Sequence, residues 1–90
     1  MTNIQASSEV RAHVHSYIED NFLYLHPDKA FTDSDQLLGL GILDSLGFVE
    51  LVEEVQDRFG VPVEDTDITE ENFGSVDAIV RYVEGKRAAA

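Results

Sequence analysis

The hydroxyl of Ser45 is the side chain of this sequence best placed for chemistry, because Asp44-Ser45 stands directly before a segment with helical periodicity. A serine can act as a nucleophile when a histidine activates it and a carboxylate orients that histidine. The histidines are His13, His15 and His26, so such a set can be written down for this chain. A domain of ninety residues, however, buries only about three-fifths of its unfolded surface and has little interior for a catalytic pocket. Asp-Ser before a helix is more typical of an N-terminal cap, and we expect no self-sufficient enzyme.

Metal and disulfide chemistry find little support in the sequence. There is no cysteine, which excludes disulfides and thiolate ligands. The first two histidines are two positions apart on a predicted helix and therefore point in different directions. The pairs Asp33/Asp35 and Asp65/Asp67 resemble fragments of a calcium loop, but both lack the glycine at the sixth position and the glutamate at the twelfth. We expect no metal site.

The charge of the chain is strongly negative and unevenly distributed. Eighteen acidic residues against six lysines and arginines give a net charge of −12. No Lys or Arg lies between Ala30 and Asp57, a stretch that contains seven acids: Asp33, Asp35, Asp44, Glu50, Glu53, Glu54 and Asp57. Such a surface repels nucleic acid and anionic lipid and attracts basic proteins, although solubility alone would also explain it. A hydrophobic fraction of 43% is enough for a folded core, so disorder is not expected.

The N-terminal residues carry no targeting signal that we can identify. Residues 1–5 contain neither a basic region nor an apolar run, so a signal peptide is not supported. No stretch approaches the roughly 20 apolar residues that span a bilayer. We therefore expect a cytoplasmic protein that has no membrane partner.

Helical periodicity predicts three main helices and one short helix, and no segment alternates with the period of a strand. The main helices are expected at about 8–22, 45–59 and 76–87, with caps at Ser7 or Ser8, at Asp44 and at Ser75. Gly60 and Pro62 end the second helix, and the short helix is expected at 69–73, capped by Thr69. The predicted fold is all-α, a small four-helix bundle of three main helices plus one short one. We expect one domain over residues 1–90, with an ordered core at about 8–87.

A long connection is predicted from Leu23 to Leu43. Pro27 and the run 32–35 break its regularity, and a structureless loop of this length is uncommon unless it is functional. Here it leads directly to Asp44-Ser45. Its apolar residues predict that it packs on the core: Leu25, Phe31, Leu37, Leu38, Leu40, Ile42 and Leu43.

The predicted helix 45–59 has an apolar face and an acidic face. The face expected in the core is formed by Phe48, Leu51, Val52, Val55 and Phe59. The acids lie on the opposite side at i, i+3, i+4 and i+7: Glu50, Glu53, Glu54 and Asp57. Leu46 shares the acidic side and Val49 lies at its edge, so core packing does not explain Leu46.

Residues 41–51 read GILDSLGFVEL. They resemble the phosphopantetheine-attachment signature of the acyl carrier protein family, which is Asp-Ser-Leu followed two residues later by Val-Glu-Leu. Residues 44–46 and 49–51 match both parts at that spacing. The resemblance covers about residues 8–87, because the order of the helices, the acidic second helix, Phe-Gly-Val at 59–61 and Phe-Gly-Ser-Val at 73–76 are also similar.

The resemblance implies an acyl-carrier-like bundle in which 4′-phosphopantetheine, taken from coenzyme A, is attached to Ser45 and holds cargo as a thioester. It implies a free-standing, monomeric carrier that is not itself a catalyst. The implied partners are a phosphopantetheinyl transferase, an acyl- or aminoacyl-loading ligase and downstream transferases with basic docking patches. The predicted partner surface consists of Asp44, Leu46, Val49, Glu50, Glu53, Glu54 and Asp57.

The cargo is left open at this point. The approach GILDS has one more apolar residue before the aspartate than the form common in fatty-acid carriers. It is similar to stand-alone carriers of aminoacyl groups, including D-alanyl carriers, and to peptidyl carriers of nonribosomal synthesis. The acidic second helix is instead similar to that of fatty-acid and polyketide carriers. We favour a specialised carrier outside bulk fatty-acid synthesis. The alternative is an unmodified acidic adaptor, in which Ser45 is only structural and Ser45→Ala would leave function intact.

Overall fold

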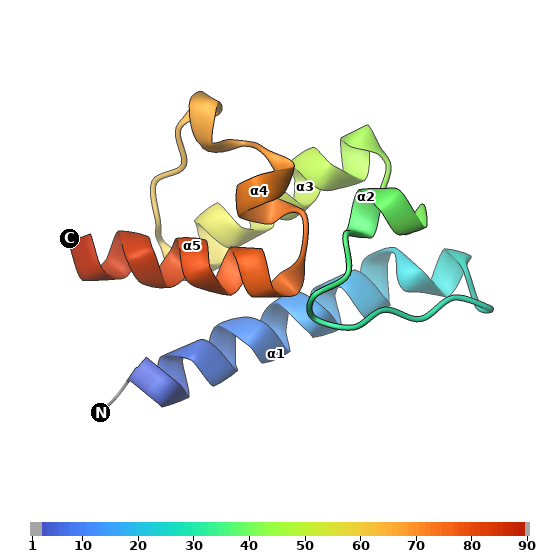
Figure 1. Ribbon diagram of the computed structural model, residues 1–90, viewed down its shortest axis with the longest axis horizontal. Helices are drawn as coiled ribbons and strands as arrows, with labels where there is room; N and C mark the ends of the chain where they lie inside the picture. Colours follow the sequence, from blue (N-terminus) through green and yellow to red (C-terminus); the bar gives the residue numbers. More distant parts are fainter. Residues whose placement is uncertain (1–2, 90) are drawn as a thin grey trace.

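The computed structural model describes residues 3–89, with side chains described for residues 8–88, and every regular element in this part of the chain is helical (Figure 1). Three helices are long: α1 (Asn3–Asn21), α3 (Ser45–Phe59) and α5 (Val76–Ala89). Two α-helices are single turns, α2 (Leu37–Leu40) and α4 (Glu70–Phe73). Two 3₁₀ turns lie at Leu23–Leu25 (η1) and Asp65–Asp67 (η2). The predicted all-α class with three main helices is confirmed.

The long helices enclose an apolar core. α1 contacts α5 and α3, and α4 lies against α5. The residues predicted to face inward are buried: Val10, Val14 and Ile18 of α1, Phe48, Leu51, Val52 and Val55 of α3, and Val76, Ile79, Val80 and Val83 of α5. Tyr17, Phe22 and Phe59 are partly buried against this cluster. The apolar faces predicted from periodicity are thus confirmed on all three helices.

The first helix begins earlier than predicted. α1 starts at Asn3, so the expected start at about Ser8, with Ser7 or Ser8 as the cap, is wrong. Serine costs only a few tenths of a kcal/mol inside a helix, roughly, and the preceding Gln5 and Ala6 favour helix, so the serines do not begin a new one. At its other end α1 stops at Asn21, one residue before the expected end.

The connection after α1 is more ordered than predicted, because it contains η1 and α2. Leu37 of α2 is fully buried, and its backbone N–H donates to the carbonyl oxygen of Gly74 over 2.8 Å. This bond joins the connection to the turn between α4 and α5. A single helical turn with Gly39 at its centre shows no periodicity in sequence, which explains why α2 was not expected.

The apolar residues of the connection divide into two groups. Leu37, Ile42 and Leu43 are buried, and Phe31 and Leu38 are partly buried against the core, as predicted. The prediction is wrong for Leu25 and Leu40, whose side chains are 61% and 37% exposed. Leu25 is the last residue of η1 and Leu40 is the last residue of α2, so both lie where a short helix ends.

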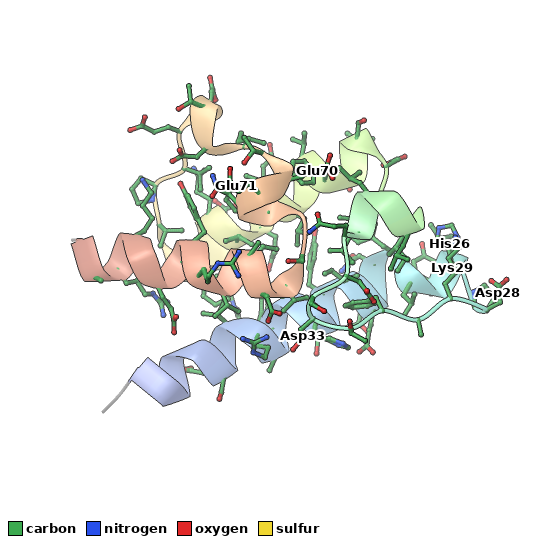
Figure 2. The ribbon with its side chains drawn as sticks, viewed as in Figure 1. His26, Asp28, Lys29, Asp33, Glu70 and Glu71 are labelled. Atoms are coloured by element: carbon green, nitrogen blue, oxygen red, sulfur yellow. The ribbon has the colours of Figure 1, made fainter. Side chains whose placement is uncertain are left out.

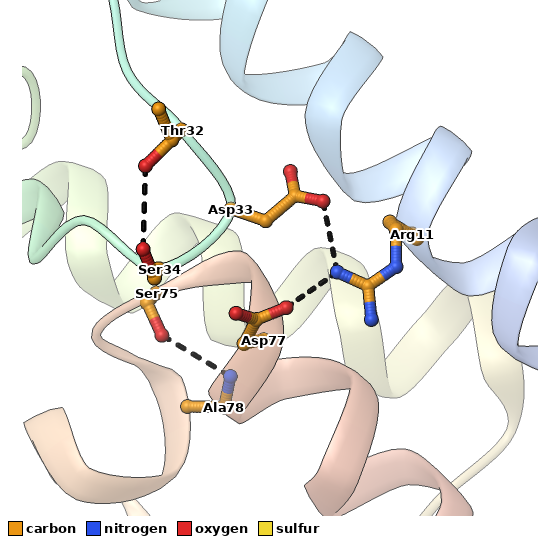
Figure 3. Close-up of polar contacts among 7 residues, drawn as sticks. All are labelled: Arg11, Thr32, Asp33, Ser34, Ser75, Asp77 and Ala78. Atoms are coloured by element: carbon orange, nitrogen blue, oxygen red, sulfur yellow. Dashed lines mark hydrogen bonds and ion pairs between the residues drawn. The ribbon is translucent and has the colours of Figure 1, made fainter.

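An arginine fastens the connection to two helices (Figure 3). The guanidinium of Arg11 on α1 donates to Asp33 Oδ2 over 2.8 Å and to Asp77 Oδ1 over 2.5 Å. The backbone N–H of Asp77 also donates to the carbonyl oxygen of Asp33 over 2.9 Å. The hydrogen bonds with Asp77 and Asp33 raise the pKa of Arg11 further above its ordinary value. The long connection is therefore tied to α1 and to the start of α5.

The second half of the chain follows the predicted caps. Thr69 Oγ1 accepts from the N–H of Asn72 over 3.3 Å, and Ser75 Oγ accepts from the N–H of Ala78 over 3.1 Å. Gly74 lies between the two helices, where a methyl group would overlap the carbonyl oxygen of Glu70 and the side chain of Gln36. The close approach of α4 to α2 thus depends on a residue without a side chain.

Candidate functional site

Ser45 is the first residue of α3 and is exposed. Asp44 before it has extended backbone angles, and its Oδ1 accepts from the N–H of Gly47 over 2.8 Å. The carbonyl oxygen of Asp44 also accepts from the N–H of Phe48 over 2.9 Å. The predicted cap is confirmed, and so is the predicted end of α3 at Gly60, whose φ is 64°. The Ser45 hydroxyl therefore stands outside the helical hydrogen bonds on a turn that its neighbours fix.

Packing on both sides holds this first turn in place. Ile42 and Leu43, directly before the cap, are 3% and 2% exposed. A Cβ at Gly47 would lie 2.9 Å from Cε1 of Phe22, so the absent side chain lets the ring lie against the turn. The sequence analysis missed this role of Gly47. The role could have been suspected from the sequence, because a glycine inside a helix costs about 1 kcal/mol relative to alanine and often has a packing reason.

The first turn of α3 is chemically suited to a phosphate ester. The first N–H groups of a helix have no intrahelical acceptor. Asp44 takes the N–H of Gly47, which leaves those of Ser45 and Leu46 for water or for an anion. An anion at the positive end of the helix dipole is favoured by roughly 0.3–1 kcal/mol. A phosphodiester on the exposed Ser45 hydroxyl thus fits this turn without any change in the helix.

The surface that continues from Ser45 along α3 is acidic with an apolar edge. Of the seven residues predicted to meet partners, six are exposed: Asp44, Leu46, Val49, Glu50, Glu53 and Asp57. Leu46 and Val49 are 67% and 44% exposed, so two apolar side chains stand in solvent within the first two turns. The structure therefore brings an exposed serine, exposed apolar groups and carboxylates together on one helix.

Glu54 differs from the other acids of α3. Its Oε2 lies 2.7 Å from Nε2 of His13 on α1, and its side chain is 29% exposed. The His13 ring lies edge-on to Phe59, with 5.5 Å between the ring centroids. Glu54 thus belongs to the contact between α1 and α3, a role that the sequence analysis did not foresee.

The negative field of α3 reaches the neighbouring helix. Burial raises the pKa of Tyr17 on α1, and the carboxylates of Glu54, Glu50 and Glu53 raise it further. The phenolate would be a further negative charge beside these acids, which is why its formation is disfavoured. The acidic face therefore acts on groups beyond its own helix.

The first two histidines lie in separate contacts. His13 pairs with Glu54, whereas His15 stacks on Phe31 with 4.5 Å between ring centroids, so the two do point in different directions. No group of three His, Asp or Glu side chains among these residues could hold a metal ion. None of the described helices is long and apolar enough to cross a membrane.

The part of the chain that contains this exposed serine and its acidic helix is similar to known proteins. Residues 21–83 match the family model described as "Phosphopantetheine attachment site". The D-alanyl carrier protein of Streptococcus sanguinis (strain SK36) is 30% identical over 81 residues, which are 90% of this chain and 99% of that protein. The D-alanyl carrier protein of Abiotrophia defectiva is 40% identical over 50 residues, 56% of this chain and 62% of that protein.

The chain belongs to the acyl carrier protein family. Its cofactor is covalently attached 4′-phosphopantetheine, whose terminal thiol supplies the thioester chemistry of these carriers. The family is one of carriers and not of catalysts, and it implies a phosphopantetheinyl transferase and a loading ligase as partners.

Proposed function

We propose that Ser45 carries the phosphopantetheine arm and that the chain transports aminoacyl cargo on it as a thioester. The observation that carries the assignment is the exposure of Ser45 at the first position of a 15-residue helix. The matched residues 21–83 contain two other serines. Ser75 is 5% exposed and its hydroxyl oxygen caps α5. Ser34 lies in a turn, with its Oγ 3.3 Å from Thr32 Oγ1, and begins no helix.

The attachment is tested by intact-mass spectrometry after incubation with coenzyme A and a broad-specificity phosphopantetheinyl transferase. We expect the wild type and the control Ser34→Ala to gain one phosphopantetheine each, and Ser45→Ala to gain none. The same result would rule out the unmodified adaptor. A gain that persists in Ser45→Ala would refute the site. No gain on the wild type, with the transferase active on another carrier, would refute the carrier role.

The aminoacyl cargo is supported by two separate observations. The approach GILDS is similar to that of aminoacyl carriers, and both relatives described above are D-alanyl carrier proteins. We therefore propose an aminoacyl cargo, with D-alanine as the first candidate. Loading of the modified chain by a D-alanine-activating ligase should be compared with L-alanine and with a panel of acyl groups. Acceptance of fatty-acid intermediates alone would contradict the proposal.

The partner surface in this proposal is the exposed side of α3, with Asp44, Leu46 and Val49 near the arm and the acids further along. Charge complementarity with a basic patch speeds encounter, and exposed ion pairs are weak enough to allow rapid release. Glu54 contributes to the negative field, although it is paired with His13. Glu50, Glu53 and Asp57 are exposed and can meet a partner directly.

A charge reversal tests this surface. Glu53→Lys should slow modification by the transferase at low salt and much less at high salt, because salt screens exposed charges. Glu9→Lys is the matched control, since it makes the same charge change at an exposed position near the start of α1. Equal rates for the two variants would contradict the docking role of α3.

Three expectations from sequence complete the proposal: a single carrier domain over residues 1–90, a monomer, and location in the cytoplasm. Sedimentation of the purified chain tests the second. A stable dimer would contradict the expectation of a monomer.

A further inference from the structure

A surface cavity of about 230 Å³ lies beside the first turn of α3. Its walls come from η1 and the residues around it, from the end of α2 and from the cap of α3: Phe22, Leu25, His26, Gly41, Ile42 and Asp44. Asp44 is the residue directly before Ser45, so the cavity begins next to the proposed attachment site. Figure 2 shows His26 and Lys29 at this end of the molecule, near α2.

The cavity has an apolar side and a polar side. Phe22, Leu25 and Ile42 supply hydrocarbon, and the side chain of Leu25 is 61% exposed. His26 and Asp44 supply polar atoms. One carboxylate oxygen of Asp44 is committed to the N–H of Gly47, which leaves the other available as an acceptor. A ligand that suits this cavity therefore carries an apolar group close to hydrogen-bonding groups.

Backbone hydrogen bonds fix the outer wall of the cavity. The N–H of His26 donates to the carbonyl oxygen of Leu23 over 2.8 Å, and the N–H of Lys29 donates to that of His26 over 2.9 Å. The ammonium group of Lys29 donates to the carbonyl oxygen of Leu40 over 2.7 Å, which ties this segment to the end of α2. The cavity is thus shaped by a chain segment that is held at both ends.

We propose that this cavity seats the part of the phosphopantetheine arm nearest the phosphate. That part carries a dimethyl-substituted carbon followed by a hydroxyl and an amide. The dimethyl group matches the apolar wall of Leu25 and Ile42, and the hydroxyl and amide match His26 and Asp44. The inference rests on the proposed function, since it requires the arm to be attached to Ser45. It also accounts for Leu25, which the fold leaves in solvent against the expectation from sequence.

The test uses the full chain modified with phosphopantetheine whose dimethyl carbons are labelled with ¹³C. We expect nuclear Overhauser effects between these methyl protons and the side chains of Leu25 and Ile42, and methyl shifts that differ from those of free pantetheine. Leu25→Ser should move the methyl shifts to the free values and weaken the effects to Ile42. Tyr24→Ser is the matched control, because Tyr24 is 65% exposed, adjacent in sequence and absent from the cavity wall.

The outcomes separate this inference from the proposed function. Mass spectrometry first establishes whether Ser45 is modified, and a failure there refutes the proposed function. A modified Ser45 with methyl shifts equal to those of free pantetheine would overturn only the seating of the arm, and would leave the cavity for a partner's side chain. Equal effects of Leu25→Ser and Tyr24→Ser would also overturn it. Both substitutions are at exposed positions, and the amide spectrum of each unmodified variant reports whether its fold is intact.

Discussion

The cap of α3 can be separated into its hydrogen bond and its charge by two substitutions at Asp44. Asp44→Ala removes the acceptor of the Gly47 N–H and costs about 0.5–2 kcal/mol of stability. It also removes a negative charge from the positive end of the helix, which adds roughly 0.3–1 kcal/mol. Gly47 is buried, so water replaces the lost acceptor poorly. We therefore expect a total loss of about 1–3 kcal/mol. Asp44→Asn keeps an acceptor and loses only the charge, so its loss should be about 0.3–1 kcal/mol.

Urea unfolding of the chain without its arm, followed by circular dichroism, measures both losses. The slope of the free energy with urea concentration should stay the same in the variants, because a cap does not change the surface exposed on unfolding. In thermal unfolding, 1 kcal/mol corresponds to roughly 4–8 °C for a domain of this size. An asparagine variant as unstable as the alanine variant would show that the charge and not the hydrogen bond stabilises the turn. Wild-type stability in both would refute the role of the cap.

The same two variants address recognition. If the transferase binds the carboxylate of Asp44 directly, Asp44→Asn will be modified more slowly than the wild type although its fold is nearly as stable. If the cap only orients Ser45, the asparagine variant will be modified at the wild-type rate and only the alanine variant will be slow. The pair thus distinguishes positioning of the serine from direct recognition of the charge.

Three further predictions concern the fold. Gly74→Ala should destabilise the chain by about 1–3 kcal/mol, since its methyl group would overlap Glu70 and Gln36. Gly85→Ala should instead stabilise the chain by about 0.5–1 kcal/mol, because a Cβ at this helical position meets nothing within 4 Å. If urea unfolding gave the same sign for both variants, the packing argument would be contradicted. A double-mutant cycle of Arg11→Gln and Asp77→Asn should give a coupling free energy of about 0.2–1 kcal/mol that falls as salt is added, because both side chains are more than a third exposed. A larger coupling that salt does not change would show that solvent does not screen this ion pair. Burial and the hydrogen bond to Asp67 raise the pKa of Tyr82 to about 12 from the ordinary 10.0. The folded state therefore holds the phenol proton more tightly than the unfolded state, and the free energy of unfolding should fall as pH rises from about 10 to about 12. Ultraviolet titration and unfolding against pH test this, and an equal alkaline loss in Tyr82→Phe would show that another group causes it.

The helices could be predicted from sequence where signals within a few residues agree. α3 was predicted to the residue because Asp44, the apolar face and Gly60 all specify the same boundaries. Ser45 could be proposed as the attachment site for the same reason, since its motif spans only residues 41–51. The start of α1 was missed because a serine is both a good cap and a tolerable interior residue, and only the residues before it decide.

The contacts that could not be predicted join residues distant in sequence. His13 and Glu54 are 41 positions apart, and Arg11 and Asp77 are 66 apart, so no local pattern indicates that they meet. The cavity beside Ser45 combines η1, the end of α2 and the cap of α3, and the first two of these elements were themselves not predicted. Leu25 was assigned to the core because composition gives no information on which side of a turn a leucine lies.

The exposed acidic residues of α3 lie in one row along the helix axis. At about 100° per residue, Leu46, Glu50, Glu53 and Asp57 fall within a sector of roughly 40–60°, so after Leu46 there is about one carboxylate per turn of 5.4 Å. Glu54 lies about 80° from Leu46, on the flank where it meets His13, and Arg58 lies further round on the same flank. On the proposed function, a partner that reaches Ser45 over Leu46 meets a row of carboxylates with no lysine or arginine among them. Its own basic side chains should therefore form a row along the axis of α3, and reversing the charge of Glu54 should affect the packing of α1 more than docking.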